Sequence, residues 1–396
     1  MPFAEFDFRK SPLVGRDMLC FSHDWSGDPL SKTHLMRLFA KDNRILWVNS
    51  IGYRSPSLGS KRDWGRIVKK LKAVAEPIRE VEPNIFVFNP LAIPSFGNRS
   101  LRAFSTRLLR EQVRMAMRKL RFRRPVNWVF NPAAGVLAGS LNEAEIVYYC
   151  VDEYTSFRGV DTSALAAIER ELLGKSHAVF VSAEPLMKSK QSRGGPPVLI
   201  RHGVDYEHFA RALSRETDVP EEIARLPKPV IGYFGLIADD WVDIPLLVGV
   251  AREFPKASIV MLGKVTMDVS ELQREPNIHL LGRKPYAELP GYCKGFDVAL
   301  IPFPISDVTL HANPLKAREY LAAGLPVVST AIPEVEVLEE CSIGRTPAEF
   351  VEEIRKALRS PGPDASRSRR MAGEGCSARV EMIRSHWPKP FASTPP

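Results

Sequence analysis

Short apolar runs alternate with segments of helical periodicity along the first half of the chain. Each run ends in a polar turn, and we predict strands at residues 18–25, 44–50, 84–90, 127–132, 145–154 and 177–183. Between them, apolar residues recur every three or four positions at 34–42 and 164–176, which predicts helices. This repeating strand–helix order predicts a parallel, doubly wound sheet, whose ligands bind beyond the carboxyl ends of the strands.

The same alternation begins again in the second half. Residues 197–209 are predicted to form a strand and turn and 218–229 a linker, followed by a helix from Ile244 and strands at 230–237, 257–265, 277–285 and 296–303. Residues 360–375 are rich in Pro, Gly, Ser and Arg, which predicts a linker or disorder, and 377–387 predicts a helix. The dinucleotide fingerprint GxGxxG is absent, which disfavours a dehydrogenase.

The stretch HANPLKAREYLAAGLPVVST, residues 311–330, predicts a helix and then a buried strand. Asn313 would cap this helix, Pro314 would occupy its first position and Gly324 would end it. Lys316 and Glu319 are three residues apart and therefore share one face. An uncovered helix start beside a lysine favours an anion, although the same pair also suits an ordinary surface ion pair.

The net charge of +9 is unevenly distributed. Residues 1–200 contain 31 Lys and Arg against 19 Asp and Glu, a charge of +12, whereas residues 201–396 contain 24 against 27, a charge of −3. The excess lies in residues 61–72 and 99–124. In the second segment Leu101, Phe104, Leu108, Val113, Met117 and Leu120 follow a helical spacing that predicts a buried face.

Two interpretations of this basic helix remain open. It is either a helix packed on its own domain with a solvated basic face, or a surface that binds anionic lipid headgroups, and both can hold together. Nucleic acid is disfavoured because no binding motif or aromatic platform accompanies the charge.

The remaining composition is that of a soluble protein. The 44% apolar content is ordinary, the amino terminus lacks the apolar region of a secretory signal, and no apolar run is long enough to cross a bilayer. The five cysteines are scattered without a CxxC pair, which favours reduced thiols and a cytoplasmic location over disulfides or a zinc site.

Four ordered motifs resemble the GT-B-fold glycosyltransferases of the large glycogen-synthase and mannosyltransferase-like family, with bacterial exopolysaccharide and teichuronic-acid enzymes most similar. They are LIRHGVDYEHF, GYFGLI, LLGRKPYAELPGYCKGFDVALIPF and NPLKAREYLAAGLPVVST. The resemblance spans about residues 197–330 well and the first half loosely, through CFSHDW and YYCVDEYTSF. It implies two Rossmann-like domains facing each other across a cleft: an acceptor domain at 1–200, a donor domain at 201–360, and a linker and tail at 361–396.

The resemblance also implies roles on the donor side. Glu319 would bind the ribose hydroxyls of a nucleoside-diphosphate sugar, and the nucleobase would lie near residues 282–286. The diphosphate would lie at the helix start, and Gly235 would let the backbone approach the ligand closely. Because Lys316 and the helix start would stabilise the leaving diphosphate, no metal or other cofactor is expected. The donor-binding residues expected are Gly235, Arg283, Tyr286, His311, Asn313, Pro314, Leu315, Lys316 and Glu319.

The chain departs from the family pattern at two places. His311 occupies the position of a glutamate that ordinarily contacts the donor sugar, which leaves the sugar undefined. The loop after GYFG contains Ala238, Asp239, Asp240 and Trp241 where many members carry Arg and Lys. Asp239, Asp240 and Asp243 also suit an ordinary solvated loop.

Catalytic candidates in the first half follow predicted strands. Asp152 is expected to act as the general base or to orient the acceptor, and Glu153 and His23 are further candidates. The alternatives are that Asp152 and Glu153 cap the following turn and that His23 is a simple hydrogen-bonding residue. The sequence does not decide between inverting transfer, which needs a base, and retaining transfer, in which the departing phosphate accepts the proton.

We therefore expect a cytoplasmic glycosyltransferase that moves a sugar from a UDP- or GDP-sugar to a surface glycan. The basic first domain favours a lipid-linked acceptor and a position on the inner face of the membrane. The alternatives are a UDP-sugar epimerase on the same architecture and a non-catalytic nucleotide-sugar or glycan-binding protein.

Overall fold

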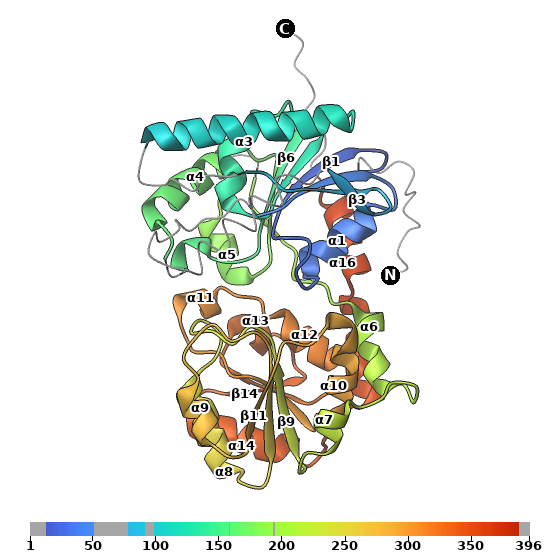
Figure 1. Cartoon of the computed structure of the whole chain (residues 1–396), viewed down its shortest axis with the longest axis vertical. Helices are drawn as coiled ribbons and strands as arrows, with labels where there is room; N and C mark the ends of the chain where they lie inside the picture. The colour runs from blue at the N-terminus through green and yellow to red at the C-terminus, as the bar shows by residue number, and fades with distance from the viewer. Residues whose placement is uncertain (1–12, 51–77, 92–98, 158, 193–194, 388–396) are drawn as a thin grey trace. The chain divides into compact units, whose positions relative to one another are not determined.

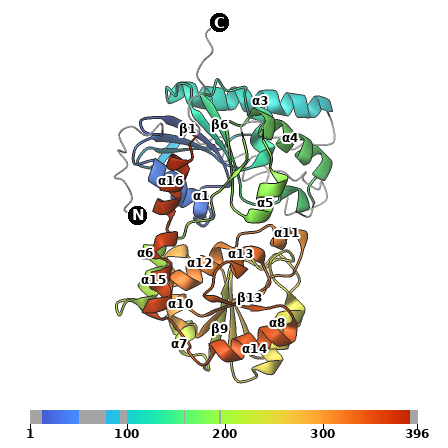
Figure 2. The ribbon, with the colours of Figure 1, turned by 180° about the vertical axis from the view of Figure 1, so that it is seen from behind.

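The computed structural model describes residues 13–50, 78–91, 99–157, 159–192 and 195–387. The predicted basic segment 61–72 lies outside the described residues. The chain divides into an amino-terminal unit, Met1–Arg201 with Val380–Pro396, and a carboxyl-terminal unit, His202–Arg379. In each unit, helices lie on both faces of one sheet (Figures 1 and 2).

The amino-terminal unit has an eight-stranded sheet in the order β3-β4-β2-β1-β5-β6-β7-β8. Its strands are β1 (Asp17–Phe21), β2 (Arg44–Val48), β3 (Arg79–Glu82), β4 (Ile85–Phe88), β5 (Val126–Val129), β6 (Glu145–Cys150), β7 (Ala178–Val181) and β8 (Val198–Leu199). Its helices are α1 (Ser31–Phe39), α3 (Arg99–Lys119), α4 (Thr162–Lys175), α5 (Glu184–Ser189) and the last residues of α16 (Cys376–Ser385). All neighbouring strands are parallel except β3, which pairs antiparallel with β4.

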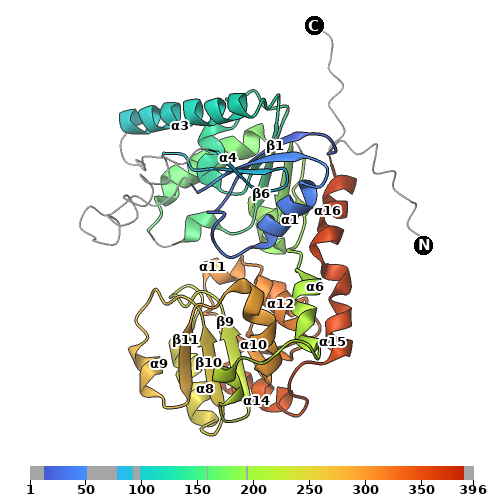
Figure 3. The same ribbon diagram turned by 45° about the vertical axis from the view of Figure 1, so that its right-hand side comes forward.

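The carboxyl-terminal unit has a parallel six-stranded sheet in the order β11-β10-β9-β12-β13-β14. Its strands are β9 (Val230–Phe234), β10 (Ser258–Leu262), β11 (Ile278–Gly282), β12 (Val298–Ile301), β13 (Val327–Thr330) and β14 (Cys341–Gly344). Its helices are α6 (Tyr206–Ala210), α7 (Glu221–Ala224), α8 (Ile244–Glu253), α9 (Ser270–Arg274), α10 (Leu289–Gly295), α11 (Asp307–Leu310), α12 (Leu315–Ala322), α13 (Pro333–Glu336), α14 (Pro347–Ala357) and α15 (Ala365–Arg370). Helix α8 contacts α9 and α14, whereas α12 contacts α6 and α15 (Figure 3).

Both sheets share one topology. In chain order, the six strands β4-β2-β1-β5-β6-β7 and the six strands β11-β10-β9-β12-β13-β14 both read 3-2-1-4-5-6, the doubly wound order. The strand order therefore reverses between β1 and β5 in one unit and between β9 and β12 in the other. In each unit, a ligand is expected to bind at the place where the strand order reverses.

Two segments predicted as linkers are ordered instead. Residues 218–229 contain α7, which buries Ile223 in the core of the unit. Residues 360–375 contain α15, whose buried Ser368 donates a hydrogen bond from Oγ to Ala322 O on α12 over 2.6 Å. One or two buried side chains suffice to order such a segment, and composition alone did not reveal them.

The basic helix α3 packs with one face only. Leu109, Val113, Ala116 and Met117 are buried against the sheet, at the helical spacing expected of an inward face. Phe104 was predicted to belong to that face, but its side chain is 58% exposed, and Met115 is 64% exposed. Within the described residues, no helix combines the length and the apolar character needed to cross a membrane.

Candidate functional site

In the carboxyl-terminal unit, Lys316 lies across the end of β9. A Cβ added to Gly235, the residue after β9, would lie 2.0 Å from Lys316 Cε and 2.7 Å from its Nζ. Gly235 has φ +144°, a conformation that other residues rarely adopt. Lys316 itself therefore occupies the space that a side chain at Gly235 would take, and the predicted close approach of a ligand to this glycine stays a prediction.

The ammonium of Lys316 lies near two aromatic rings. Its Nζ lies 5.9 Å from the ring centroid of Tyr233 and 5.8 Å from that of Phe303. Burial lowers the pKa of Lys316, and nearby Glu319 raises it. In the described part of the chain this ammonium has no hydrogen bond or ion pair, so a bound anion would supply its missing counter-charge.

Helix α12 begins one residue later than predicted. Its N-cap residue is Pro314, no side chain caps the helix, and the first helical residue is Leu315. Asn313 does not cap it because its Oδ1 accepts a hydrogen bond from Arg318 Nη1 over 2.7 Å. The helix ends at Ala322, and Gly324, the predicted stop, follows two residues later with φ +81°.

Arg318 is a residue that the sequence reasoning missed. Its side chain is 1% exposed, and its Nε lies 3.4 Å from Glu374 Oε2. A buried arginine that binds Asn313 fixes the loop before α12, and therefore the direction from which the backbone enters the helix. The available signal was the helical spacing, which places Arg318 on the inward side of α12.

Glu319 lies one turn after Lys316 on the same helix and is 7% exposed. The next residue, Tyr320, accepts a hydrogen bond at its hydroxyl from Phe234 N over 2.8 Å, which ties α12 to the end of β9. Burial, Glu319 and Asp205 together raise the pKa of Tyr286. Lys316, Glu319 and Tyr286, three of the predicted donor-binding residues, therefore lie near one another in this unit.

The remaining donor candidates have contacts of their own. Tyr286 stacks on His208, with ring centroids 4.3 Å apart, and its carbonyl oxygen accepts a hydrogen bond from His208 Nε2 over 2.9 Å. Arg283 is exposed. His311 follows α11 and donates a hydrogen bond from Nδ1 to Asp307 O over 2.7 Å. Asp243 caps α8 by accepting from Leu246 N.

In the amino-terminal unit, His23 follows β1 and Asp152 follows β6. Burial, together with the charge of Lys32, lowers the pKa of His23 to about 3. The ring of His23 lies 3.1 Å from Ser22 Oγ through Nδ1 and 3.3 Å from Thr33 Oγ1 through Nε2. Histidine 23 is therefore a neutral, hydrogen-bonded residue at neutral pH.

The pKa of Asp152 shifts in the opposite direction to that of His23. Burial raises its pKa to about 6, against the charge of Lys32, which lowers it. Lys32, in the first turn of α1, has its own pKa lowered by burial. The sequence reasoning missed Lys32, although a cation in the first turn of a helix opposes the helix dipole and was a usable signal.

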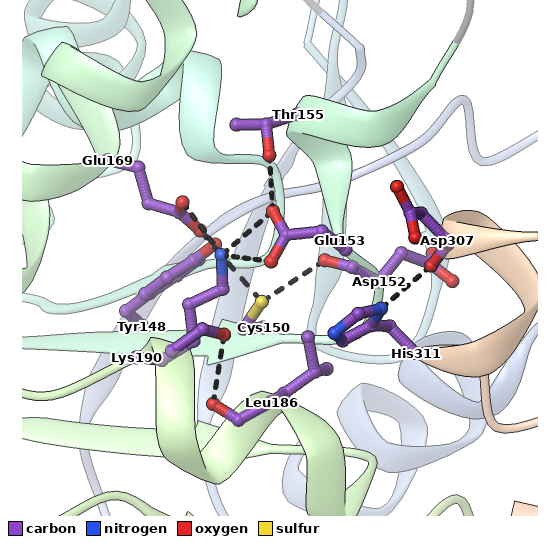
Figure 4. A network of polar contacts seen from close by, with 11 residues as sticks. Tyr148, Cys150, Asp152, Glu153, Thr155, Glu169, Leu186, Lys190, Asp307 and His311 are labelled. Atoms are coloured by element: carbon purple, nitrogen blue, oxygen red, sulfur yellow. Dashed lines mark hydrogen bonds and ion pairs between the residues drawn. The ribbon is translucent and has the colours of Figure 1, made fainter. Parts of the chain in front are cut away.

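Glu153 turns away from Asp152 into a buried network (Figure 4). Its Oε2 lies 2.8 Å from Lys190 Nζ, and its Oε1 accepts a hydrogen bond from Thr155 Oγ1 over 2.6 Å. Burial would raise the pKa of Glu153, but these two partners lower it overall. Glu153 occupies the N-cap position of the turn Tyr154–Ser156, although its side chain makes no capping hydrogen bond.

Comparison with known proteins adds a family and a fold. Residues 228–360 match the family model described as glycosyl transferases group 1. TuaH of Bacillus subtilis (strain 168), whose name assigns it to teichuronic acid biosynthesis as a glycosyltransferase, is 24% identical over 266 residues. That alignment covers 61% of this chain and 66% of TuaH, just under two thirds of its length.

Solved structures resemble the chain over almost its whole length. Sucrose-phosphate synthase from Thermosynechococcus elongatus has a TM-score of 0.63 at 16% identity, covering 93% of this chain and 94% of that one. Anabaena HepE in complex with UDP and glucose has a TM-score of 0.65 at 11% identity, with 93% and 98% covered. A UDP-forming trehalose-phosphate synthase from Burkholderia xenovorans has a TM-score of 0.66 at 13% identity, with 94% and 98% covered. These likenesses confirm the predicted GT-B fold.

Proposed function

Because residues 228–360 form a domain of the glycosyl transferases group 1 family, we propose that this chain transfers a sugar from a nucleoside-diphosphate sugar to a glycan acceptor. The observation that carries this proposal is the buried ammonium of Lys316, which lies at the end of β9 and, within the described residues, makes no hydrogen bond or ion pair. HepE was solved with UDP and with UDP-glucose, which supports UDP over GDP as the nucleotide of this chain.

On the donor side, the diphosphate binds beside Lys316 and the start of α12. No side chain caps the start of that helix, so the N–H groups of Leu315 and Lys316 can meet phosphate oxygens, which the helix dipole also favours. Glu319 accepts hydrogen bonds from the ribose hydroxyls, and the base lies near residues 282–286. The ammonium of Lys316 and the start of α12 stabilise the leaving diphosphate, so the transfer needs no metal ion.

On the acceptor side, Asp152 is the better general base of the three candidates. A base is most effective when its pKa lies near the working pH, which favours Asp152 at about 6 over His23 at about 3. Glu153 is less suited because Lys190 and Thr155 already occupy its carboxylate.

The acceptor is lipid-linked, and the chain binds anionic membranes through the outward face of α3. Phe104 and Met115 are eleven residues apart, about three helical turns, and so lie on one face. Arg107 and Arg118, each one turn further on, are exposed beside them. Exposed apolar side chains flanked by arginines suit a lipid surface that carries negative headgroups. The membrane would be the inner face of the cytoplasmic membrane.

A panel of UDP- and GDP-sugars with isolated lipid-linked glycans tests the proposal. We expect release of UDP together with a lengthened glycan, unaffected by EDTA. Interconversion of the nucleotide-sugar without any acceptor would instead identify an epimerase. Binding of the nucleotide-sugar without turnover, under every acceptor tried, would identify a binding protein.

A further inference from the structure

A buried network of charges lies behind the loop that carries Asp152 (Figure 4). Lys190 Nζ is 2.8 Å from Glu153 Oε2 and 2.9 Å from Glu169 Oε2. The exposed fractions of these side chains are 4% for Lys190, 11% for Glu153 and 7% for Glu169. Glu153 belongs to the loop after β6, Glu169 to α4, and Lys190 follows α5. One ammonium thus joins three separate segments of the amino-terminal unit.

Both carboxylates have a second donor. Tyr148, on β6, donates its hydroxyl proton to Glu169 Oε1 over 2.5 Å, and Thr155 Oγ1 donates to Glu153 Oε1 over 2.6 Å. Each bond fixes the direction of an oxygen as well as its distance. The network therefore leaves Glu153 little freedom to turn.

Hydrogen bonds also fix the backbone around Asp152. Its carbonyl oxygen accepts hydrogen bonds from Tyr154 N over 3.1 Å and from Cys150 Sγ over 3.2 Å. Ser182 Oγ donates to the carbonyl oxygen of the preceding residue, Val151, over 2.8 Å. The Asp152 side chain turns away from Lys190, whereas that of its neighbour Glu153 turns toward it (Figure 4).

We infer that Lys190 is a positioning residue, which holds Glu153 against Glu169 and thereby fixes the direction of the neighbouring Asp152 carboxylate. This inference rests on the proposed function, in which Asp152 contacts the acceptor hydroxyl. Buried ion pairs rarely stabilise a fold more than well-packed apolar side chains would. Their directional contacts do specify one path for a loop, and here that loop presents Asp152.

The kinetic test compares three variants of the full chain. Lys190→Met removes the bridge, Lys190→Arg retains a cation that can bind both carboxylates, and Lys188→Met changes an exposed lysine two residues earlier. We expect Lys190→Met to lower kcat by about 10- to 100-fold, as a displaced catalytic group does, while the KM for the donor stays within about twofold. Lys190→Arg should restore most of the rate, and Lys188→Met should match the parent.

A second variant guards against misfolding of Lys190→Met. This variant combines Lys190→Met with Glu153→Gln and Glu169→Gln and so removes all three charges of the network. No unpaired charge then remains buried, and the two glutamines can still accept hydrogen bonds from Thr155 and Tyr148. If this variant melts like the parent and still loses kcat, the inference is supported. If it is folded and retains the parent's kcat, the network is merely structural and the inference is overturned.

A readout independent of turnover separates this inference from the proposed function. Carbon-13 NMR titration follows the Asp152 carboxyl, whose charged neighbour in this unit is Lys32 of α1. A shifted titration midpoint in Lys190→Met supports positioning even if the parent transfers no sugar, a result that would defeat the proposed function alone. An unchanged midpoint together with an unchanged kcat would defeat the positioning role alone.

Discussion

Asp152 and Glu153 are adjacent carboxylates whose pKa values shift in opposite directions. Burial raises that of Asp152 to about 6, whereas the partners of Glu153, led by Lys190, outweigh its burial and lower its pKa. Neighbouring acids whose surroundings shift their pKa values in opposite directions commonly have different roles. The sequence placed both after a strand, but it contained no sign of which one a buried lysine would bind, because Lys190 is distant in the chain.

Asp152→Asn tests the role of the first carboxylate. We expect kcat to fall by about 10²- to 10⁴-fold, the usual contribution of a general base, with UDP affinity unchanged. In the parent, kcat should rise with pH through about 6 because the base acts only when deprotonated. Glu171→Gln, an exposed acid on α4, is the control. A variant with near-parental kcat and the same acid limb would exclude Asp152 as the base.

Gly235→Ala tests the close approach at the end of β9. The new Cβ would displace the end of Lys316, and φ +144° would add about 1–3 kcal/mol of strain. We expect UDP binding to weaken about tenfold or more while the fold persists. Gly249→Ala, inside α8 with open space around it, should instead stabilise the unit by about 0.5–1 kcal/mol. Calorimetric titration and melting measure both, and equal UDP affinity in the two variants would contradict the assignment.

At the scale of elements, the sequence predicted the strands and main helices well and their ends less well. The start of α12 moved by one residue because Asn313 binds Arg318, a contact that no capping preference contains. Strand β3 was missed because its sequence REVE lacks an apolar run and pairs only along one edge. Phe104 was misplaced because it lies nine residues before the buried Val113, about two and a half helical turns, and so faces the opposite side of α3.

The proposed binding of α3 to anionic membranes can be tested by substitution of its exposed residues. Phe104→Ser with Met115→Ser should weaken binding to phosphatidylglycerol vesicles about tenfold or more, because apolar contact is lost. Arg107→Gln with Arg118→Gln should weaken it further and reduce its salt dependence. Ile305→Ser, an equally exposed apolar position in the other unit, is the control for the apolar change. Co-sedimentation that needs no anionic lipid, or that is unchanged in the α3 variants, would exclude this surface.

For the whole molecule, two doubly wound sheets follow from the alternation of strands and helices, and the solved structures confirm the GT-B fold. This topology explains why one motif was enough to predict a candidate donor site: the strand order reverses between β9 and β12, and Lys316 of α12 lies beside the end of β9. Lys190 and His208 could not be predicted, because each acts through partners far away in the sequence, whereas the first-turn position of Lys32 and the helical spacing of Arg318 were signals that went unused.

The most direct test of the account is a calorimetric titration of the full chain with UDP. We predict that the parent binds UDP and that Lys316→Ala weakens this binding about 10- to 150-fold, the cost of losing a charged hydrogen bond of about 1.5–3 kcal/mol. Lys256→Ala, at an exposed lysine after α8, should bind like the parent. A parent that does not bind UDP, or a Lys316→Ala variant that binds as tightly, would contradict the central claim.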